Sequence, residues 1–304
     1  MTQLDLRPLS IGELFDRAFV LYRRHFWLFV GLTAVPGIFA LTMTLAQQGF
    51  QALITPNPGE SPAVSADDVA GAMGFLGAMV ASMAIYWVVY MIALGAATLA
   101  VSEIYMGRTV TIREVFGRMR GRTGALIVLL LIVGLRLFGL LLLGMMFIGG
   151  SVRVASTVSP VMGGLLAFMF LAATLGITLV LMLRYGVAIP ALIVEGLRPN
   201  AAVRRSVELT RGRLGRVFLL GLCATLITYA AVILFQGPFL AAAMVAGLES
   251  TAGFWLNIAG AVTGTIGTTL TTPFLIIGLA LIYYDARIRE EGFDLELTLA
   301  ALDR

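Results

Sequence analysis

The chain has 304 residues, of which 59% are hydrophobic and only 12% are charged. The charged share is about half that of an ordinary globular protein, and a soluble fold of this size could not bury so much apolar surface. Composition therefore excludes soluble enzymes, disordered tails and disulfide scaffolds, and it predicts a multi-pass membrane protein.

Apolar runs divide the chain into membrane-spanning segments. A helix needs about 20 apolar residues to cross the hydrocarbon core. Six runs are long enough: 26–46, 69–102, 125–148, 161–183, 217–235 and 256–284. The first run is too long for a signal peptide and has no small-residue cleavage site after it. We therefore predict an all-α integral membrane protein with six transmembrane helices and no cleaved leader.

The distribution of basic residues predicts the orientation. The net charge is +4, and all 21 basic residues are arginines. Nineteen of them fall in the N-terminal arm, in the tail, or after the second and fourth spans. The opposite loops, at 47–68, 149–160 and 236–255, contain a single basic residue, Arg153. Because cytoplasmic segments are enriched in basic residues, both termini are predicted to be cytoplasmic.

An internal repeat is visible on the arginine-rich side. RPLSIGELFDR (7–17) and RTVTIREVFGR (108–118) are identical at five of eleven positions, and Leu197-Arg198-Pro199 repeats Leu6-Arg7-Pro8 more faintly. We predict three parallel units, each a cytoplasmic amphipathic helix followed by a helical hairpin. Their bounds are about 1–104, 105–196 and 197–304. The alternative is that positive-inside and capping preferences alone make these helices alike.

Capping residues in the sequence mark where the predicted amphipathic helices start, and arginines give these helices a basic surface. Ser10 with Glu13, and Thr111 with Glu114, have the spacing of a capping box. The arginines of these segments should form a cytoplasmic basic collar that meets anionic lipid head groups. The collar residues are Arg17, Arg23, Arg24, Arg113, Arg118, Arg204, Arg205 and Arg211. Since the arginines lie between spans, membrane lipids are the expected partners, together with a possible protein partner and no nucleic acid.

No catalytic constellation is visible in the sequence. One histidine, His25, and one cysteine, Cys223, cannot supply a triad or a histidine-based zinc site. There is no phosphate-binding G-x-x-x-x-G-K-[ST] loop, because the chain has no lysine. We expect no enzyme activity, no metal and no cofactor.

Arg136 is the exception among the apolar runs. It lies near the middle of the third run, where a central arginine costs about 2.5–3.5 kcal/mol to insert. It should face a polar cavity, backbone carbonyls, or the head group of an anionic lipid or solute. The alternative is that the span is shifted or tilted, which leaves Arg136 near the outer surface.

The sixth run is rich in small and hydroxyl-bearing residues. Residues 259–272 read AGAVTGTIGTTLTT, a composition that favours close helix packing. The sharper hypothesis is that its polar face lines a cavity into which Arg136 points. The threonines proposed for that speculative ligand or anionic-lipid site are Thr265, Thr268, Thr269 and Thr272.

Three segments carry a resemblance to a known family. LRPLSIGELFDRAFVLYRRHF (6–26), IPALIVEGLRPNAAVRRSVELTRGR (189–213) and YYDARIREEGFDLEL (283–297) resemble prokaryotic proteins labelled "glycerophosphoryl diester phosphodiesterase membrane domain". The resemblance implies a six-span protein of the bacterial inner membrane. It covers the membrane region only, without the catalytic barrel or the histidines of the diesterase, and so implies no hydrolase activity.

Two functions remain open from the sequence. The first is a non-catalytic membrane protein that organises or anchors a partner at the cytoplasmic membrane. The second is a transporter or lipid-handling protein that uses a polar intramembrane site around Arg136. The sequence leaves the ligand, the partner and the oligomeric state unspecified.

Overall fold

The computed structural model describes residues 10–54, 66–248 and 250–291. Within these residues every regular element is a helix. The ten helices are α1 (Ile11–Arg24), α2 (Phe26–Ile54), α3 (Ala66–Tyr105), α4 (Ile112–Met119), α5 (Thr123–Thr157), α6 (Pro160–Tyr185), α7 (Ala188–Glu195), α8 (Pro199–Leu209), α9 (Leu214–Ala246) and α10 (Thr251–Glu291). The all-α prediction is confirmed. Arg7 and the tail beyond Glu291 lie outside the described residues.

Six of these helices are long and apolar enough to cross a membrane. They contain all six predicted runs, but most extend further than hydropathy alone indicated. The predicted outer loops at 149–160 and 236–255 are therefore shorter than expected, since α5 continues to Thr157 and α9 to Ala246. Ser159 caps α6, and Pro160 occupies its first turn, which explains why the reversal between α5 and α6 is so tight.

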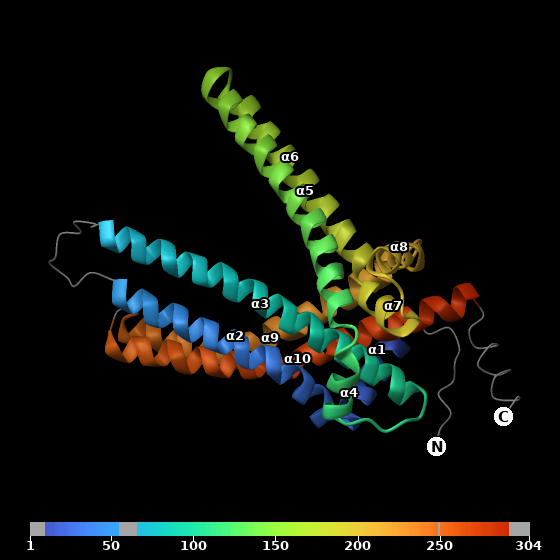
Figure 1. Ribbon diagram of the computed structural model, residues 1–304. Coiled ribbons are helices and arrows are strands. Elements are labelled where there is room, and N and C mark those ends of the chain that lie inside the picture. The colour runs from blue at the N-terminus through green and yellow to red at the C-terminus, as the bar shows by residue number, and fades with distance from the viewer. Residues whose placement is uncertain (1–9, 55–65, 249, 292–304) are drawn as a thin grey trace, which may run out of the picture.

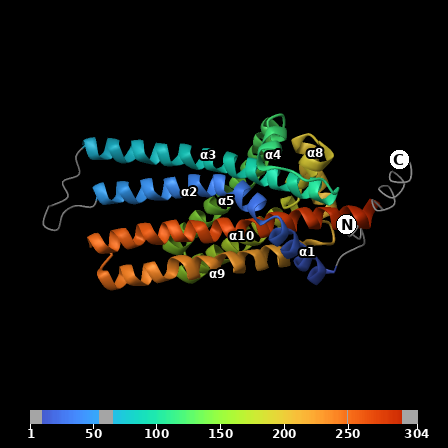
Figure 2. The ribbon, with the colours of Figure 1, turned by 90° about the horizontal axis from the view of Figure 1, so that it is seen from below.

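Four long helices lie side by side in one layer. Figure 2 shows the order α3, α2, α10, α9. Helix α10 packs most extensively against α9 and α2, while α2 packs against α3. The starts of α1 and α4 and the end of α10 lie at the same end of this layer (Figure 1). Most of the buried core lies near that end, where it includes Leu192, Ile277 and Tyr283.

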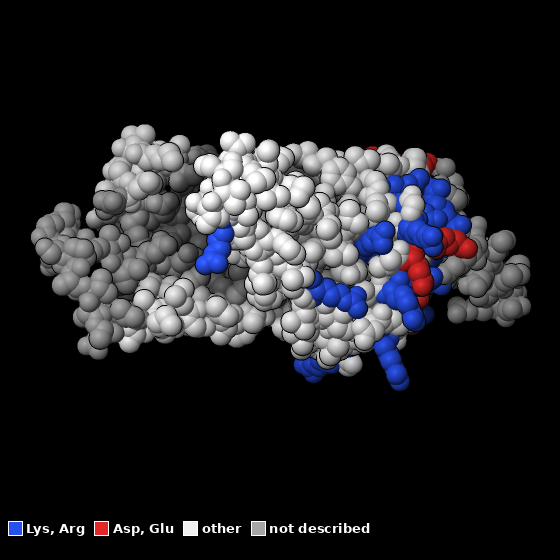
Figure 3. All heavy atoms as spheres, turned by 90° about the horizontal axis from the view of Figure 1, so that it is seen from above, with Lys and Arg blue, Asp and Glu red and all other residues white. Residues whose placement is uncertain are grey.

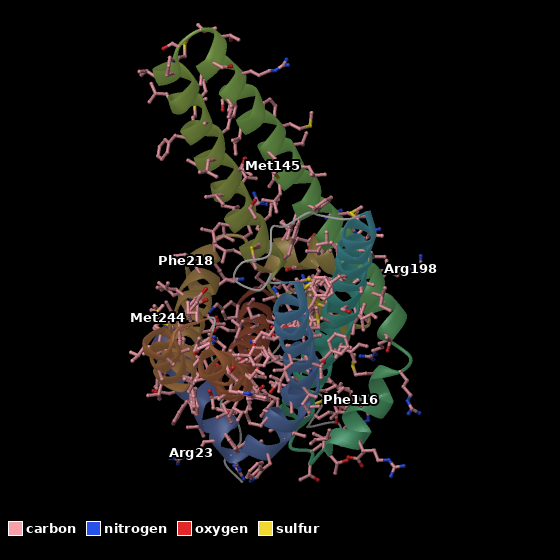
Figure 4. The ribbon with its side chains drawn as sticks, turned by 90° about the vertical axis from the view of Figure 1, so that its left-hand side faces the viewer. Arg23, Phe116, Met145, Arg198, Phe218 and Met244 are labelled. Carbon is pink, nitrogen blue, oxygen red and sulfur yellow. The ribbon has the colours of Figure 1, made fainter. Side chains whose placement is uncertain are left out.

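Helices α5 and α6 form a hairpin that diverges from the layer (Figure 1). In the most apolar stretch of the segment Pro160–Glu195, which contains α6, only 6% of the residues are buried. The corresponding share is 50% in α3 and in α10. Figure 4 shows side chains standing out from the hairpin, and Met145 is 69% exposed. In a membrane such side chains face lipid, because the chain itself does not cover them.

Both predicted capping boxes are present. Ser10 accepts a hydrogen bond from the Glu13 backbone N–H, while the Glu13 carboxylate accepts one from the Ser10 backbone. Thr111 and Glu114 repeat this arrangement at the start of α4. The hydrogen bond from the Thr111 backbone holds the pKa of Glu114 below its ordinary value. The two helix starts are therefore encoded locally, as the sequence predicted.

Candidate functional site

Two buried carboxylates and one half-buried carboxylate lie at the arginine-rich end of the bundle, each near the end of a long apolar segment. Glu103 lies in the last turn of α3 and Asp285 in the last turns of α10, and their side chains are 7% and 3% exposed. Glu195 is the last residue of α7, which follows α6 after a short turn. A buried carboxylate requires a partner, because removing a charge from water is costly.

Each of these carboxylates pairs with an arginine from another helix. Glu103 meets Arg118 of α4 at 2.8 Å. Glu195 meets Arg205 of α8 at 3.2 Å. In two of the three cases the arginine comes from the short helix that follows along the chain, so the ion pair holds that helix against the end of the preceding long apolar segment.

Asp285 has the most enclosed set of contacts. It accepts hydrogen bonds from Arg216 at the start of α9, at 2.8 Å, and from Arg289 of its own helix, at 3.0 Å. Arg213 adds an ion pair to Glu290 one turn further along α10, at 2.8 Å. These contacts join the arginine-rich ends of α9 and α10.

Tyrosines of α10 connect the three ion-pair sites. The Tyr283 hydroxyl donates a hydrogen bond to the Glu195 carboxylate at 2.8 Å, and the Tyr284 hydroxyl donates one to Ser102 beside Glu103. The Tyr284 ring stacks on Tyr105, with centroids 5.2 Å apart. We refer to Glu103, Glu195, Asp285, Arg118, Arg205, Arg216, Tyr283 and Tyr284 together as the ion-pair collar.

The predicted basic-collar arginines fall into two groups. Arg118 and Arg205 belong to the ion-pair collar, and Arg17 is half-buried on α1. The others are exposed at the same end of the molecule: Arg23, Arg24, Arg113, Arg204 and Arg211. Figure 3 shows arginines gathered toward this end.

Arg136 lies on α5 and is exposed. Its guanidinium lies 6.0 Å from the ring centroid of Tyr185, at the end of α6. Such a cation–π contact gives a partly desolvated cation a favourable neighbour. Because Tyr185 belongs to the arginine-rich end of α6, the side chain is directed toward that end rather than toward the hairpin tip.

Three of the four threonines of the predicted site are bonded within α10 itself. Thr265, Thr268 and Thr272 each donate a hydrogen bond to a backbone carbonyl three or four residues earlier. Thr269 contacts α2, where Thr33 donates to its carbonyl oxygen at 3.1 Å. Among the described residues no hydrogen bond joins Arg136 to these threonines, so the structure does not bring the two parts of that predicted site together.

The glycines of the same run face α9. A Cβ placed on Gly260, Gly264 or Gly267 would approach Phe239, Gln236 or Phe235 closely. The small residues thus allow α9 and α10 to pack at short range, which agrees with the packing interpretation of this run.

The sequence did not identify the buried acids as a set. The available signal was an acidic residue at the end of three apolar stretches, where an unpaired carboxylate would be costly. Their partners could not be read from the sequence, because Asp285 and Arg216 are 69 residues apart. The described residues contain no group of three or more His, Cys, Asp or Glu side chains that could hold a metal ion.

Comparison with protein-family models, curated proteins and solved structures gave no match to this chain. The family resemblance of the three segments therefore stays a prediction. The structure indicates only the class of protein: its six long apolar helices are compatible with a multi-pass membrane protein.

Proposed function

We propose that this chain is a non-catalytic, multi-pass protein of the bacterial inner membrane that organises or anchors a partner protein at the cytoplasmic face. The supporting observation is that the arginines of the basic end fall into two kinds. Those that face carboxylates fix the helix ends, whereas Arg113 of α4 and Arg204 of α8 are exposed and take no part in the ion-pair collar. Exposed arginines of this kind suit an acidic protein partner.

The proposal includes the orientation and the threefold organisation. The positive-inside rule supports a cytoplasmic position for the arginine-rich end and for both termini. The paired capping boxes, and the ion pairs that Glu103 and Glu195 form with the next amphipathic helix, support three successive hairpin units. The alternative function, transport or lipid handling around Arg136, has the contact with Tyr185 in its favour.

Charge reversal tests the anchoring role. We expect Arg113→Glu combined with Arg204→Glu to reduce the amount of bound partner at least tenfold, because both changes place negative charge on the docking surface. The measurement is quantitative mass spectrometry of proteins that co-purify with the tagged chain in polymer nanodiscs. Arg205 is avoided, since its loss would leave Glu195 without its arginine.

Arg153 provides the matched control for this experiment. It is also exposed, but it lies near the tip of the α5–α6 hairpin, at the opposite end of the span. Arg153→Glu should leave the co-purifying partner unchanged. Equal loss in the control, or an unchanged partner in the double variant, would refute anchoring through the exposed arginines.

A further inference from the structure

A hollow lies where the end of α6 meets the turn between α8 and α9. Its volume is about 290 Å³, and its lining residues are Arg184, Val207, Thr210, Arg211, Gly212 and Leu214. The Ser206 hydroxyl donates to the Arg184 carbonyl oxygen at 2.6 Å, which holds α8 against α6. Gly212 has φ +74°, a conformation that favours glycine and allows the turn to place Arg211 beside the hollow.

The two arginines of the hollow differ from their neighbours. Arg205, Arg213 and Arg216 each face a carboxylate. The guanidinium groups of Arg184 and Arg211 form neither a hydrogen bond nor an ion pair within the described part of the chain. The Thr210 hydroxyl donates to carbonyls of its own helix, and it carries no charge that would offset the guanidinium groups. The hollow therefore presents uncompensated positive charge.

An apolar groove continues from Arg184 along α6. It has a volume of about 350 Å³ and is lined by Gly176, Ile177, Val180, Leu181 and Arg184. Residues 177, 180, 181 and 184 occupy one helical face. A Cβ added at Gly176 would meet no atom within 4 Å, and this glycine lies about 12 Å deeper in the helix than Arg184. Positive charge and apolar surface are thus continuous.

We propose that this site binds one anionic phospholipid, with its phosphate between Arg184 and Arg211 and an acyl chain along the α6 groove. Basic pockets beside membrane helices on the cytoplasmic side attract anionic head groups. A water-soluble phosphate would use the arginines alone, whereas a phospholipid uses both parts of the site. This inference is independent of the anchoring function, since the anchoring proposal rests on Arg113 and Arg204 and the lipid site on Arg184 and Arg211.

A lipid titration tests the charged part of the site. The purified full-length chain is delipidated in detergent, titrated with phosphatidylglycerol or phosphatidylcholine, and examined by native mass spectrometry. We expect the first equivalent of phosphatidylglycerol to bind at least tenfold more tightly than phosphatidylcholine. Arg184→Gln with Arg211→Gln should abolish this preference, while the corresponding Lys variants should keep most of it.

Two control pairs separate a specific site from general attraction. Arg113→Gln with Arg204→Gln removes the same charge elsewhere and should leave the preference intact. Gly176→Leu fills the groove and should weaken phosphatidylglycerol binding at least fivefold, whereas Gly164→Leu, at an equally open position on α6, should not. Excess inorganic phosphate should not displace the lipid. Equal loss in the control arginine pair, unchanged binding in Gly176→Leu, or displacement by phosphate would overturn the proposal.

Discussion

Replacing Asp285 by alanine is expected to lower the free energy of unfolding by about 3 kcal/mol, the lower end of the range for breaking a buried ion pair. The Asp285 side chain is 3% exposed, and its removal leaves Arg216 and Arg289 beside each other without that carboxylate. The loss should also loosen the contact between α9 and α10. Unfolding of the purified protein by a denaturing detergent, followed by circular dichroism, measures the change.

Glu208 supplies the control for Asp285. Its side chain is 56% exposed, and it reaches Arg205 only at 3.9 Å. An exposed pair of this kind contributes at most about 0.5 kcal/mol, so Glu208→Ala should be close to neutral. If the two variants were equally stable, the ion-pair collar would not hold the helix ends together.

Gly163→Leu should disrupt the α5–α6 hairpin. A Cβ at Gly163 would collide with backbone atoms of Ala155, so neither a rotamer change nor a small side-chain shift can accommodate it. Overpacking against a side chain costs about 1–3 kcal/mol, and a clash with backbone should cost more than this. We expect a lower yield of folded protein and cleavage near the hairpin tip by added protease.

Gly164 is the matched control for this substitution. It is the next residue in α6, and a Cβ added there would have no atom within 4 Å. Gly164→Leu should therefore give wild-type yield and protease resistance. Comparable damage in both variants would show that added bulk in α6, rather than the close approach to Ala155, causes the defect.

The six long apolar helices could be predicted because hydropathy and length are local properties of the chain. Their ends were less accurate, since α9 continues to Ala246 through Gly237-Pro238, a pair that usually ends or kinks a helix. The capping boxes were also predictable, because Ser10 and Glu13 are three residues apart. The divergence of the α5–α6 hairpin was not, because an apolar side chain facing lipid has the same hydropathy as one facing another helix.

The candidate sites depended on contacts between distant residues, which the sequence did not reveal. Arg136 was singled out from the sequence as unusual, but its neighbour Tyr185 lies 49 residues away on the facing helix. Thr265, Thr268 and Thr272 were polar in the sequence, and their hydroxyls are nevertheless bonded within α10. Arg184 gave no signal by itself, because an arginine at the end of a span is ordinary. Its interest comes from the turn that places Arg211 beside the same hollow.

The functional proposals for this chain assume that the ion-pair collar lies on the cytoplasmic side, and site-directed labelling tests this proposed position most directly. Cys223 is changed to serine, and single cysteines are introduced at Ser156, near the hairpin tip, or at Asn200, on α8. Both positions are exposed. With a membrane-impermeant thiol reagent on bacterial cells whose outer membrane has been opened, Ser156→Cys should react, and Asn200→Cys should react only after the inner membrane is permeabilised. Reaction of Asn200→Cys before permeabilisation, with Ser156→Cys protected, would contradict the orientation and the proposed cytoplasmic docking surface.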